Sequence, residues 1–207
     1  TILDITTKQK KRMIQISTDE VFGSLSKGTA TEESRFNPSS PYAATKAAAE
    51  LLINSYFTTF NSDVVITRCT NNYGPRQFVE KLIPKTIILA YNNKKIPIYG
   101  NGKSIRDWIY VDDHCEAIIL ALQKGKSGES YNISASNEID VLAVVKKLLT
   151  LLDKPLSNLQ FGEGRPGEDL RYSLDSSKIR KELGWRHKIN SDEGFQKTIQ
   201  WYIENKN

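Results

Sequence analysis

The sequence predicts an α/β protein whose mostly parallel sheet is covered by helices on both faces. Short apolar runs rich in β-branched residues alternate with longer segments of helical periodicity. Polar clusters follow directly after two of these runs, and the carboxyl ends of parallel strands are where such sheets bind ligands. A composition of 39% hydrophobic and 26% charged residues over 207 positions suits one large domain, or a domain with a lobe.

The expected strands are short and apolar, and polar or turn-forming residues bound them. "DVVITRC" is the clearest example, since its apolar residues are mainly β-branched and the loop "TNNYG" follows. In chain order the predicted strands are residues 12–17, 63–69, 95–100 and 129–134.

The expected helices alternate with these strands. The first has the clearest start, because Ser40 suits an N-cap, Pro41 suits the first helical position and an alanine run follows. Gly125 is a plausible stop for another. The predicted helices are residues 41–60, 80–92, 111–125, 139–152, 175–183 and 191–205. The opening residues 1–12 look like the back half of a helix without a cap, so upstream sequence is expected to be missing.

Charge and cysteine content exclude several classes of function. The net charge is +5, and the basic run over residues 8–12 has no interleaved aromatic residues, which favours a solvated face over a nucleic-acid site. No apolar run is long enough for a membrane span, and none resembles a signal peptide. Cys69 and Cys115 stand alone, and His114 and His187 have no partner at ligand spacing. We therefore expect no metal, no membrane or nucleic-acid partner, and a reducing cytoplasm.

Two adjacent carboxylates raise the question of function. Thr18, Asp19 and Glu20 follow the first strand at the edge where a site would form, and a polar crevice is the natural place for them. Tyr42 and Lys46 lie four residues apart on the next helix, so they share one face. An ammonium beside a phenol favours the phenolate, which could then act as a base. Either pair alone could be ordinary surface, but the two lie on consecutive elements of one predicted edge.

Long, ordered motifs over nearly the whole chain resemble the extended short-chain dehydrogenases/reductases, and among them the dTDP-glucose 4,6-dehydratases most. The motifs are "STDEVFG", "PYAATKAAAELL", "RCTNNYGPRQFVEKLIP", "PIYGNGKSIRDWIYVDD" and "GRPGEDLRYSLDSSKIRKELGW". Thr-Asp-Glu after the first strand is the dehydratase pattern within this superfamily.

The resemblance implies a catalytic set and a cofactor, NAD. Tyr42 would take the proton of the sugar 4-hydroxyl, Lys46 would hold Tyr42 as a phenolate and contact the cofactor ribose, and Thr18 would bond near the 4-oxygen. The resemblance assigns Glu20 as the base at C5 and a protonated Asp19 as the acid that releases water from C6. Asn72 would lie on the nicotinamide side. The implied substrate contacts, in addition to Thr18, are Asn71, Lys81, Leu82, Pro97, Ile98, Tyr99, Arg106 and Arg165.

The resemblance also implies the architecture and the partners. We expect part of a Rossmann-like doubly wound sheet, residues 1–74 and about 112–135, and a smaller, mostly helical lobe that binds the nucleotide sugar, residues 75–111 and about 136–207. The implied partners are a nucleotide-diphosphate sugar and a second copy of the chain, since such enzymes are commonly homodimers that pair through the Tyr42 helix.

Departures from the family pattern leave some questions open. The glycine-rich turn that cradles the NAD pyrophosphate is absent from the sequence, so the 207 residues alone are expected to be inactive. Arg76–Gln77, Gly164–Glu168 and Val141 differ from the usual residues near the nucleotide, which leaves dTDP against UDP and the identity of the hexose open. A sugar-nucleotide 4-epimerase, a UDP-glucuronate decarboxylase and a non-catalytic sugar-nucleotide binder remain alternatives.

Overall fold

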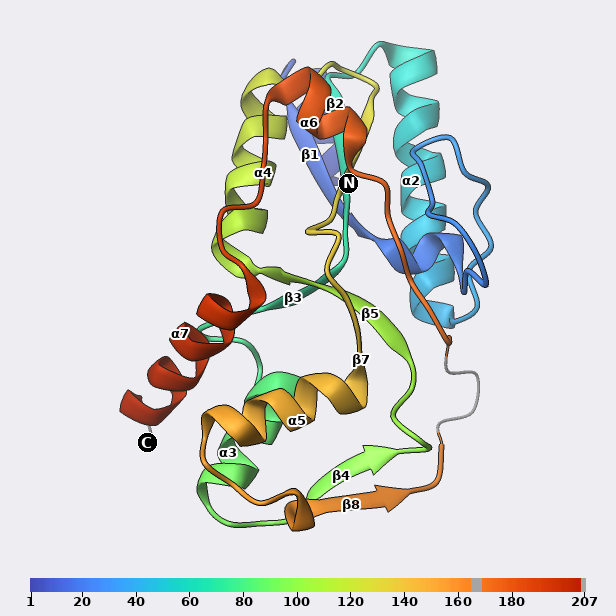
Figure 1. The fold of residues 1–207 in the computed structure, drawn as a ribbon. Helices are drawn as coiled ribbons and strands as arrows, with labels where there is room; N and C mark the ends of the chain where they lie inside the picture. Colours follow the sequence, from blue (N-terminus) through green and yellow to red (C-terminus); the bar gives the residue numbers. More distant parts are fainter. Residues whose placement is uncertain (165–168, 206–207) are drawn as a thin grey trace.

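The computed structural model describes residues 1–164 and 169–205 and divides the chain into an upper and a lower part (Figure 1). The upper part is a parallel sheet between helices. Its three strands are hydrogen-bonded in the order β1-β2-β6. Their bounds are Met13–Thr18 for β1, Val64–Cys69 for β2 and Ser130–Ile133 for β6. The predicted α/β class with parallel strands is confirmed.

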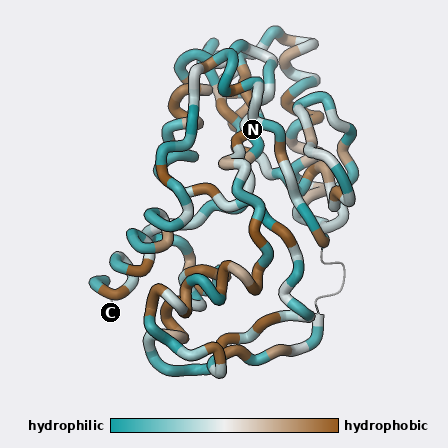
Figure 2. Tube along the Cα trace, in the orientation of Figure 1, coloured by the Kyte–Doolittle hydropathy of each residue, from teal (hydrophilic) through white to brown (hydrophobic). Residues whose placement is uncertain are grey.

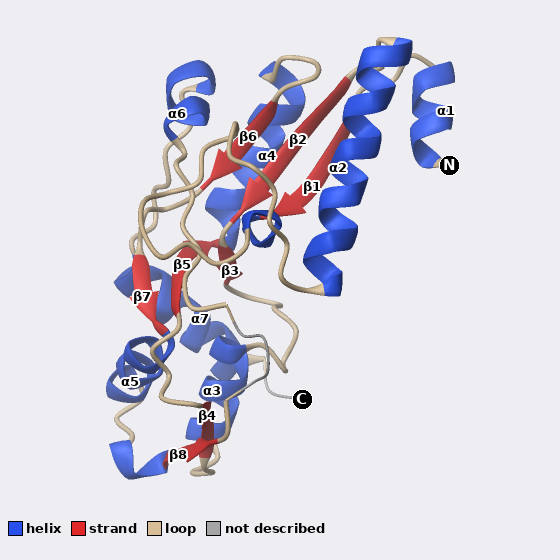
Figure 3. Ribbon diagram, turned by 90° about the vertical axis from the view of Figure 1, so that its right-hand side faces the viewer, coloured by secondary structure: helices blue, strands red, loops and turns tan. Residues whose placement is uncertain are grey.

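Helices cover both faces of this sheet because side chains alternate along β2. Val64 and Ile66 pack on one face with residues of α1 and α2, and Val65 packs on the other with residues of α4 and α6. Figure 3 shows the three strands side by side, with α1 and α2 on one side of them. The helices are α1 (Ile2–Lys8), α2 (Pro41–Phe60), α4 (Val111–Lys124) and α6 (Ser177–Leu183).

Helix α2 begins and ends where its sequence indicates. The Ser40 hydroxyl accepts a hydrogen bond of 3.1 Å from the amide of Ala43, and Pro41 occupies the first helical position. Asn61 ends the helix in the left-handed conformation, with φ 51°. The prediction for residues 41–60 is confirmed, so Tyr42 lies in the first turn of α2.

A buried ion pair joins α2 to β2. The Arg68 guanidinium donates to both carboxylate oxygens of Glu50, at 2.7–3.1 Å, and the two side chains are 4% and 0% exposed. The guanidinium carbon also lies 5.1 and 5.4 Å from the ring centroids of Phe22 and Phe36. The pair therefore fixes the helix that bears Tyr42 against the strand that leads to Asn71.

The lower part combines short strands with three helices. Strands β3 (Asn71–Tyr73), β5 (Ile105–Tyr110) and β7 (Glu138–Asp140) form one small sheet, in which β5 is parallel to β3 and antiparallel to β7. Strands β4 (Ile96–Tyr99) and β8 (Leu159–Gly162) form a parallel pair. The helices are α3 (Leu82–Tyr91), α5 (Val141–Leu151) and α7 (Ser191–Glu204), and short 3-10 turns lie at Asp19–Phe22 (η1) and Leu156–Asn158 (η2).

The inner faces of α3, α5 and α7 build the core of the lower part. Hydrophobic and hydrophilic residues alternate along the α5 segment in Figure 2, as expected of a helix with one buried face. Val144 and Leu148 of α5 are fully buried together with Ile83 and Ile87 of α3 and Phe195 of α7.

The chain passes between the two parts more often than two contiguous blocks would require. One residue, Thr70, separates β2 from β3, and β5 continues directly into α4 at Val111. Helix α6 packs on the upper sheet through Ile179 and Leu183, and Trp185 just after it joins the same core, whereas the predicted boundaries place this segment in the lobe. Its apolar residues find their complement on α4 and β6, a contact that local sequence does not reveal.

Local expectations differ from the structure at two further points. Thr1 caps α1, because its hydroxyl accepts from the Asp4 amide at 3.3 Å and the Asp4 carboxylate bonds back, so the expected lack of a cap is wrong. Strands β3, β5, β7 and β8 have no counterpart among the predicted strands. They have three to six residues and mixed polarity, so packing rather than periodicity determines them.

Candidate active site

Two polar segments meet at the carboxyl edge of the upper sheet. Thr18 is the last residue of β1 and lies opposite Cys69, the last residue of β2. The parallel register therefore places Asp19 and Glu20, in η1, beside the segment that continues into Asn71. Adjacent parallel strands bring their carboxyl ends to the same edge, which is why residues some fifty positions apart converge here.

Thr18 organises the first segment. Its hydroxyl donates to Asp19 Oδ1 at 3.2 Å and accepts from the amide of Glu20 at 3.3 Å. The hydroxyl thereby caps the 3-10 turn and fixes the Asp19 carboxyl. A threonine with both roles holds the two acidic residues in a defined geometry.

Asp19 is a buried acid. It is 6% exposed, and its Oδ2 has no hydrogen-bond partner among the described residues. Burial raises the pKa of Asp19 to about 7, helped by the nearby negative charges of Glu20 and Asp107. The Asp19 carboxyl can therefore hold a proton close to neutral pH.

Glu20 is in a different environment. Its side chain is only partly buried, and although burial raises the pKa of Glu20, the cations Arg106 and Lys81 oppose that shift. Two adjacent acids in unlike surroundings can take opposite roles, one protonated and one charged.

Tyr42 lies at the rim of this acidic pair. Its side chain is 51% exposed. Burial of the rest of the side chain raises the pKa of Tyr42, and the negative charge of Glu20 adds to the effect, whereas a hydrogen bond with Thr18 opposes it. The side chains of Tyr42, Thr18 and Glu20 are thus brought together.

Lys46 does not make the phenol acidic in this structure. Its Nζ donates to the backbone oxygen of Ile16 at 3.0 Å and lies 6.0 Å from the centroid of the Tyr42 ring. The expectation that Lys46 favours the Tyr42 phenolate is not met here, since the pKa of Tyr42 rises. The main physical reason is partial burial of the phenol, and the negative charge of Glu20 adds to it.

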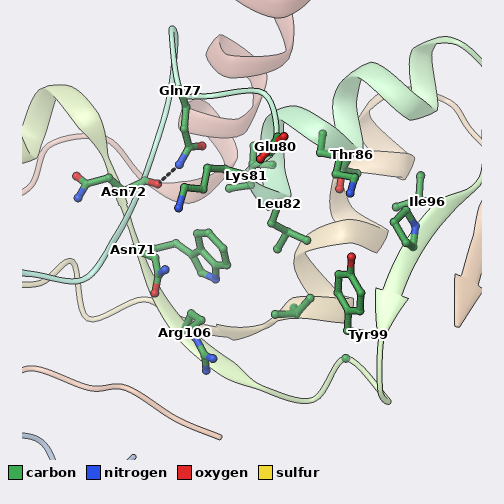
Figure 4. A pocket seen from close by; sticks show the side chains of 16 residues that line it. Asn71, Asn72, Gln77, Glu80, Lys81, Leu82, Thr86, Ile96, Tyr99 and Arg106 are labelled. Carbon is green, nitrogen blue, oxygen red and sulfur yellow. Dashed lines mark hydrogen bonds between the residues drawn. The ribbon is translucent and has the colours of Figure 1, made fainter. Parts of the chain in front are cut away.

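A cavity of about 270 Å³ opens next to this edge, within the lower part (Figure 4). Strands β3, β4 and β5 and the start of α3 supply its walls. The lining residues are Asn71, Asn72, Gln77, Glu80, Lys81, Leu82, Ile83, Lys85, Thr86, Ile96, Pro97, Tyr99, Gly102, Arg106, Trp108 and Val141.

The cavity has two chemically different ends. Asn71, Asn72 and Gln77 lie at one end in Figure 4, and Tyr99 lies at the other. Lys81 and Arg106 line the cavity on the side of the amides, and both lower the pKa of Glu20. The Arg106 side chain is held by the backbone oxygens of Ile105 and Asp169, each at 2.8 Å, and its guanidinium carbon lies 4.5 Å from the centroid of the Tyr172 ring.

The family follows from a comparison with known proteins. The model of the GDP-mannose 4,6 dehydratase family matches residues 1–198. The chain belongs to this family.

The similarity extends to curated and solved members of related enzyme types. A probable dTDP-glucose 4,6-dehydratase of Sinorhizobium fredii is 45% identical over 202 residues, which cover 94% of this chain and 58% of that protein. A crystal structure of dTDP-glucose 4,6-dehydratase from Bacillus anthracis in complex with NAD superposes with a TM-score of 0.95 at 42% identity, covering 99% of this chain and 66% of that one. A Bacillus cereus UDP-glucuronic acid 4-epimerase has a TM-score of 0.93 at 27% identity, covering 98% and 65%. The chain thus spans about 58% of the length of the first of these relatives.

The structure places most of the expected site residues of this GDP-mannose 4,6-dehydratase family member around one region. Thr18, Asp19, Glu20 and Tyr42 converge at the sheet edge, and Asn71, Asn72, Lys81, Leu82, Pro97, Tyr99 and Arg106 line the cavity. Ile98 does not line it, because its side chain is 1% exposed and packs with Val145 and Leu149. Pro97 and Tyr99 line the cavity whereas Ile98 packs in the core, which corrects its expected role. Arg165 lies outside the described residues.

Several lining residues were not predicted as site residues. Gln77 stands out in the sequence only as a departure from the family pattern, and Glu80 and Lys85 have no local signal apart from their place within and directly after "EKLIP". Trp108 is a buried aromatic residue. It is 6% exposed and its indole donates to the Ile139 oxygen at 3.3 Å, but it also forms part of the cavity wall. Among the described residues, no group of histidine, cysteine and acidic side chains could hold a metal ion.

The buried Asp19 makes stability depend on pH. The pKa of Asp19 is raised from 3.8 to about 7 in the folded state, so the folded protein binds more protons than the unfolded chain between these values. Stability is therefore lost as pH rises from about 4 to 7.

Asp19→Asn is expected to raise the unfolding free energy at pH 8, by several kcal/mol at most, since one pKa unit corresponds to about 1.4 kcal/mol. Urea unfolding of both proteins from pH 4 to 8 measures the difference in unfolding free energy. An equal increase at pH 4 and at pH 8 would contradict a raised pKa of Asp19.

Proposed function

We propose that the full-length protein is an NAD-dependent nucleotide-sugar 4,6-dehydratase that converts dTDP-glucose to its 4-keto-6-deoxy product and water. The observation that carries this proposal is the pairing of a buried, protonatable Asp19 with a partly exposed Glu20 beside the Tyr42 hydroxyl. The relatives named dTDP-glucose 4,6-dehydratase support the choice of reaction.

The residues present fit the nicotinamide-ribose side of NAD. Tyr42 and Lys46 lie on one face of α2 beside β1, which is an edge strand among the described strands. The Asn72 Oδ1 is buried without a hydrogen-bond partner among the described residues, so an amide donor from a ligand would suit it. When bound there, NAD would supply a hydride acceptor for C4 of the sugar and a hydride donor for C6.

The chain's own residues would handle the protons. Tyr42 would take the proton of the 4-hydroxyl as the C4–H bond breaks, a step that requires the phenolate form of Tyr42. The positive charge of bound NAD and the Lys46 ammonium would favour that form. A ketone at C4 acidifies the C5 proton, and Glu20 removes it. Asp19 donates its proton to the leaving 6-hydroxyl, so that the C6–O bond breaks and water departs. The neutral state that burial gives Asp19 is the state this step requires.

The cavity suits the rest of the substrate. Lys81 and Arg106 would bind the diphosphate, since guanidinium and ammonium groups pair with phosphate oxygens. Pro97 and Tyr99 would lie along the base and ribose, and Leu82 beside them. Asn71 would face the hexose, next to the catalytic edge, and Asn72 the nicotinamide side.

Product mass tests the proposal against its alternatives. The full-length protein is expected to convert dTDP-glucose to a product lighter by one water, as measured by mass spectrometry. An isomer of unchanged mass would instead indicate a 4-epimerase, a reaction that the structural similarity to an epimerase favours as the second candidate. Loss of carbon dioxide from UDP-glucuronate would indicate a decarboxylase, and binding without turnover a non-catalytic protein.

We also propose that the protein is a cytoplasmic homodimer that pairs through α2. Leu51 and Leu52 of this helix are 62% and 52% exposed, more than expected for large apolar side chains in a helix without a partner. Light scattering tests the dimer, and cell fractionation tests the location. Cys69 and Cys115 are free thiols, which suits a reducing compartment. Within residues 1–164 and 169–205, no helix has the length and apolarity to cross a membrane.

A further inference from the structure

One end of the cavity contains three unsatisfied amide oxygens. Asn71 Oδ1, Asn72 Oδ1 and Gln77 Oε1 are all buried, and none has a hydrogen-bond partner among the described residues. All three residues line the same cavity. Buried acceptors without donors are rare in folded proteins, so three in one wall indicate groups that a ligand satisfies.

Backbone carbonyls fix which way two of these amides face. Gln77 Nε2 donates to the Asn72 backbone oxygen at 2.8 Å, and Asn72 Nδ2 donates to the Thr70 backbone oxygen at 3.3 Å. A carbonyl can only accept, so the amide nitrogen must face it and the amide oxygen must face away. The unpaired atoms are therefore oxygens and not misassigned nitrogens.

Gln77 is also held in place along its backbone. Arg76 directly before it adopts the left-handed conformation, with φ 62°, which is uncommon for a residue other than glycine. The Gln77 backbone oxygen accepts a hydrogen bond from the Tyr202 hydroxyl of α7. With its backbone and its amide nitrogen both engaged, Gln77 presents its Oε1 as a positioned acceptor.

Such an acceptor selects for a ligand that offers a hydrogen-bond donor at this end. Figure 4 places Gln77, Asn71 and Asn72 at the end of the cavity away from Tyr99, with Lys81 near them. Phosphate oxygens are acceptors and suit the cations instead. Hexose hydroxyls are donors, and the amide end leads to the catalytic edge through Thr70.

We propose that Gln77 is a specificity-determining residue whose Oε1 accepts a hydrogen bond from a ring hydroxyl of the hexose. This inference rests on the proposed function, because it takes the ligand to be a nucleotide hexose. A sugar that lacks the donor would leave Gln77 Oε1 unpaired on binding, and a site built to bond a hydroxyl rejects an analogue without it.

The test measures binding by calorimetry, independently of turnover. The full-length protein and its Gln77→Met variant are titrated with dTDP-glucose and with dTDP, which lacks the sugar. Gln77→Met is expected to weaken the binding of dTDP-glucose by about 3- to 10-fold, the size of one neutral hydrogen bond, and to leave the affinity for dTDP unchanged. Equal weakening of both ligands, or none, would overturn the proposal.

Fluorinated sugars identify the bond itself, because fluorine replaces a hydroxyl at similar size and cannot donate. Among dTDP-2-deoxy-2-fluoroglucose and dTDP-3-deoxy-3-fluoroglucose, one is expected to bind the unmodified protein several-fold more weakly than dTDP-glucose, and to lose that difference in Gln77→Met. If the affinity of each analogue relative to dTDP-glucose is the same in the unmodified protein and in Gln77→Met, Gln77 does not bond these hydroxyls and the proposal fails.

Controls separate the role of Gln77 from folding and from the reaction. Gln123→Met makes the same change on an exposed position of α4 and is expected to alter no affinity. If dTDP-glucose binds with this pattern but is not dehydrated, the proposed function fails and the role of Gln77 stands. If no nucleotide hexose binds more tightly than its nucleotide, the role of Gln77 is excluded.

Discussion

Replacing Tyr42 with phenylalanine in the full-length protein is expected to lower kcat for dTDP-glucose by about 10²- to 10⁴-fold, the usual contribution of a general acid or base. The variant keeps the aromatic ring and loses only the hydroxyl that Thr18 and Glu20 surround. The Michaelis constant should change little, because the cavity residues that would bind the nucleotide are untouched. Steady-state formation of the 4-keto product measures the effect.

Tyr91→Phe is the matched control for this substitution. Tyr91 lies on α3 with 43% of its surface exposed, and it does not line the cavity next to the catalytic edge. Loss of its hydroxyl should leave kcat within about twofold. A Tyr42→Phe variant that retained more than a tenth of the activity would show that the phenol is not the proton acceptor, whatever the reaction proves to be.

Arg68→Met is expected to destabilise the fold by about 3 to 5 kcal/mol, because it leaves the Glu50 carboxylate buried without its partner. Glu50 is 0% exposed, so water cannot replace the lost guanidinium. The variant also removes the cation that lies near the rings of both Phe22 and Phe36. Urea unfolding at neutral pH, fitted with the same m-value for both proteins, measures the difference in unfolding free energy.

The double variant Arg68→Met/Glu50→Leu tests the reason for this loss. Apolar residues of similar volume often replace a buried ion pair at little cost, so the double variant should recover much of the stability that the single one loses. Lys188→Met breaks the exposed pair with Glu116, whose side chains are 66% and 40% exposed, and should cost about 1 kcal/mol or less. If Arg68→Met alone lowered the unfolding free energy by no more than this, the buried and unpaired Glu50 carboxylate would not be the reason for the loss of stability.

The elements that could be predicted from sequence are those whose signal is local. Helix α2 is defined by Ser40, Pro41 and the alanine run, and its predicted bounds agree with the structure. The polar ends of β1 and β2 could be recognised because parallel topology brings carboxyl ends together, which Thr18 and Cys69 now show by their register.

What could not be predicted depends on tertiary partners. Helix α6 has an apolar face, but only the fold shows that this face, together with Trp185 just after the helix, packs on α4 and β6. Ile98 shares a motif with Pro97 and Tyr99. The sequence predicts a strand there but does not show which side chains face the core, and Ile98 is buried in the structure. The pKa of Tyr42 depends on Glu20, which is adjacent in space and distant in sequence.

The single residue between β2 and β3 limits how the molecule can move. With Thr70 as the whole connection there, and β5 running directly into α4, the lower part is tied to the upper sheet at several places at once. The lower part is therefore not joined by one linker, and a hinge between the two parts would have to involve several short connections at once. Exchanging this lobe between relatives would therefore require a simultaneous graft of several discontinuous segments, and a contiguous swap at one junction would break the architecture.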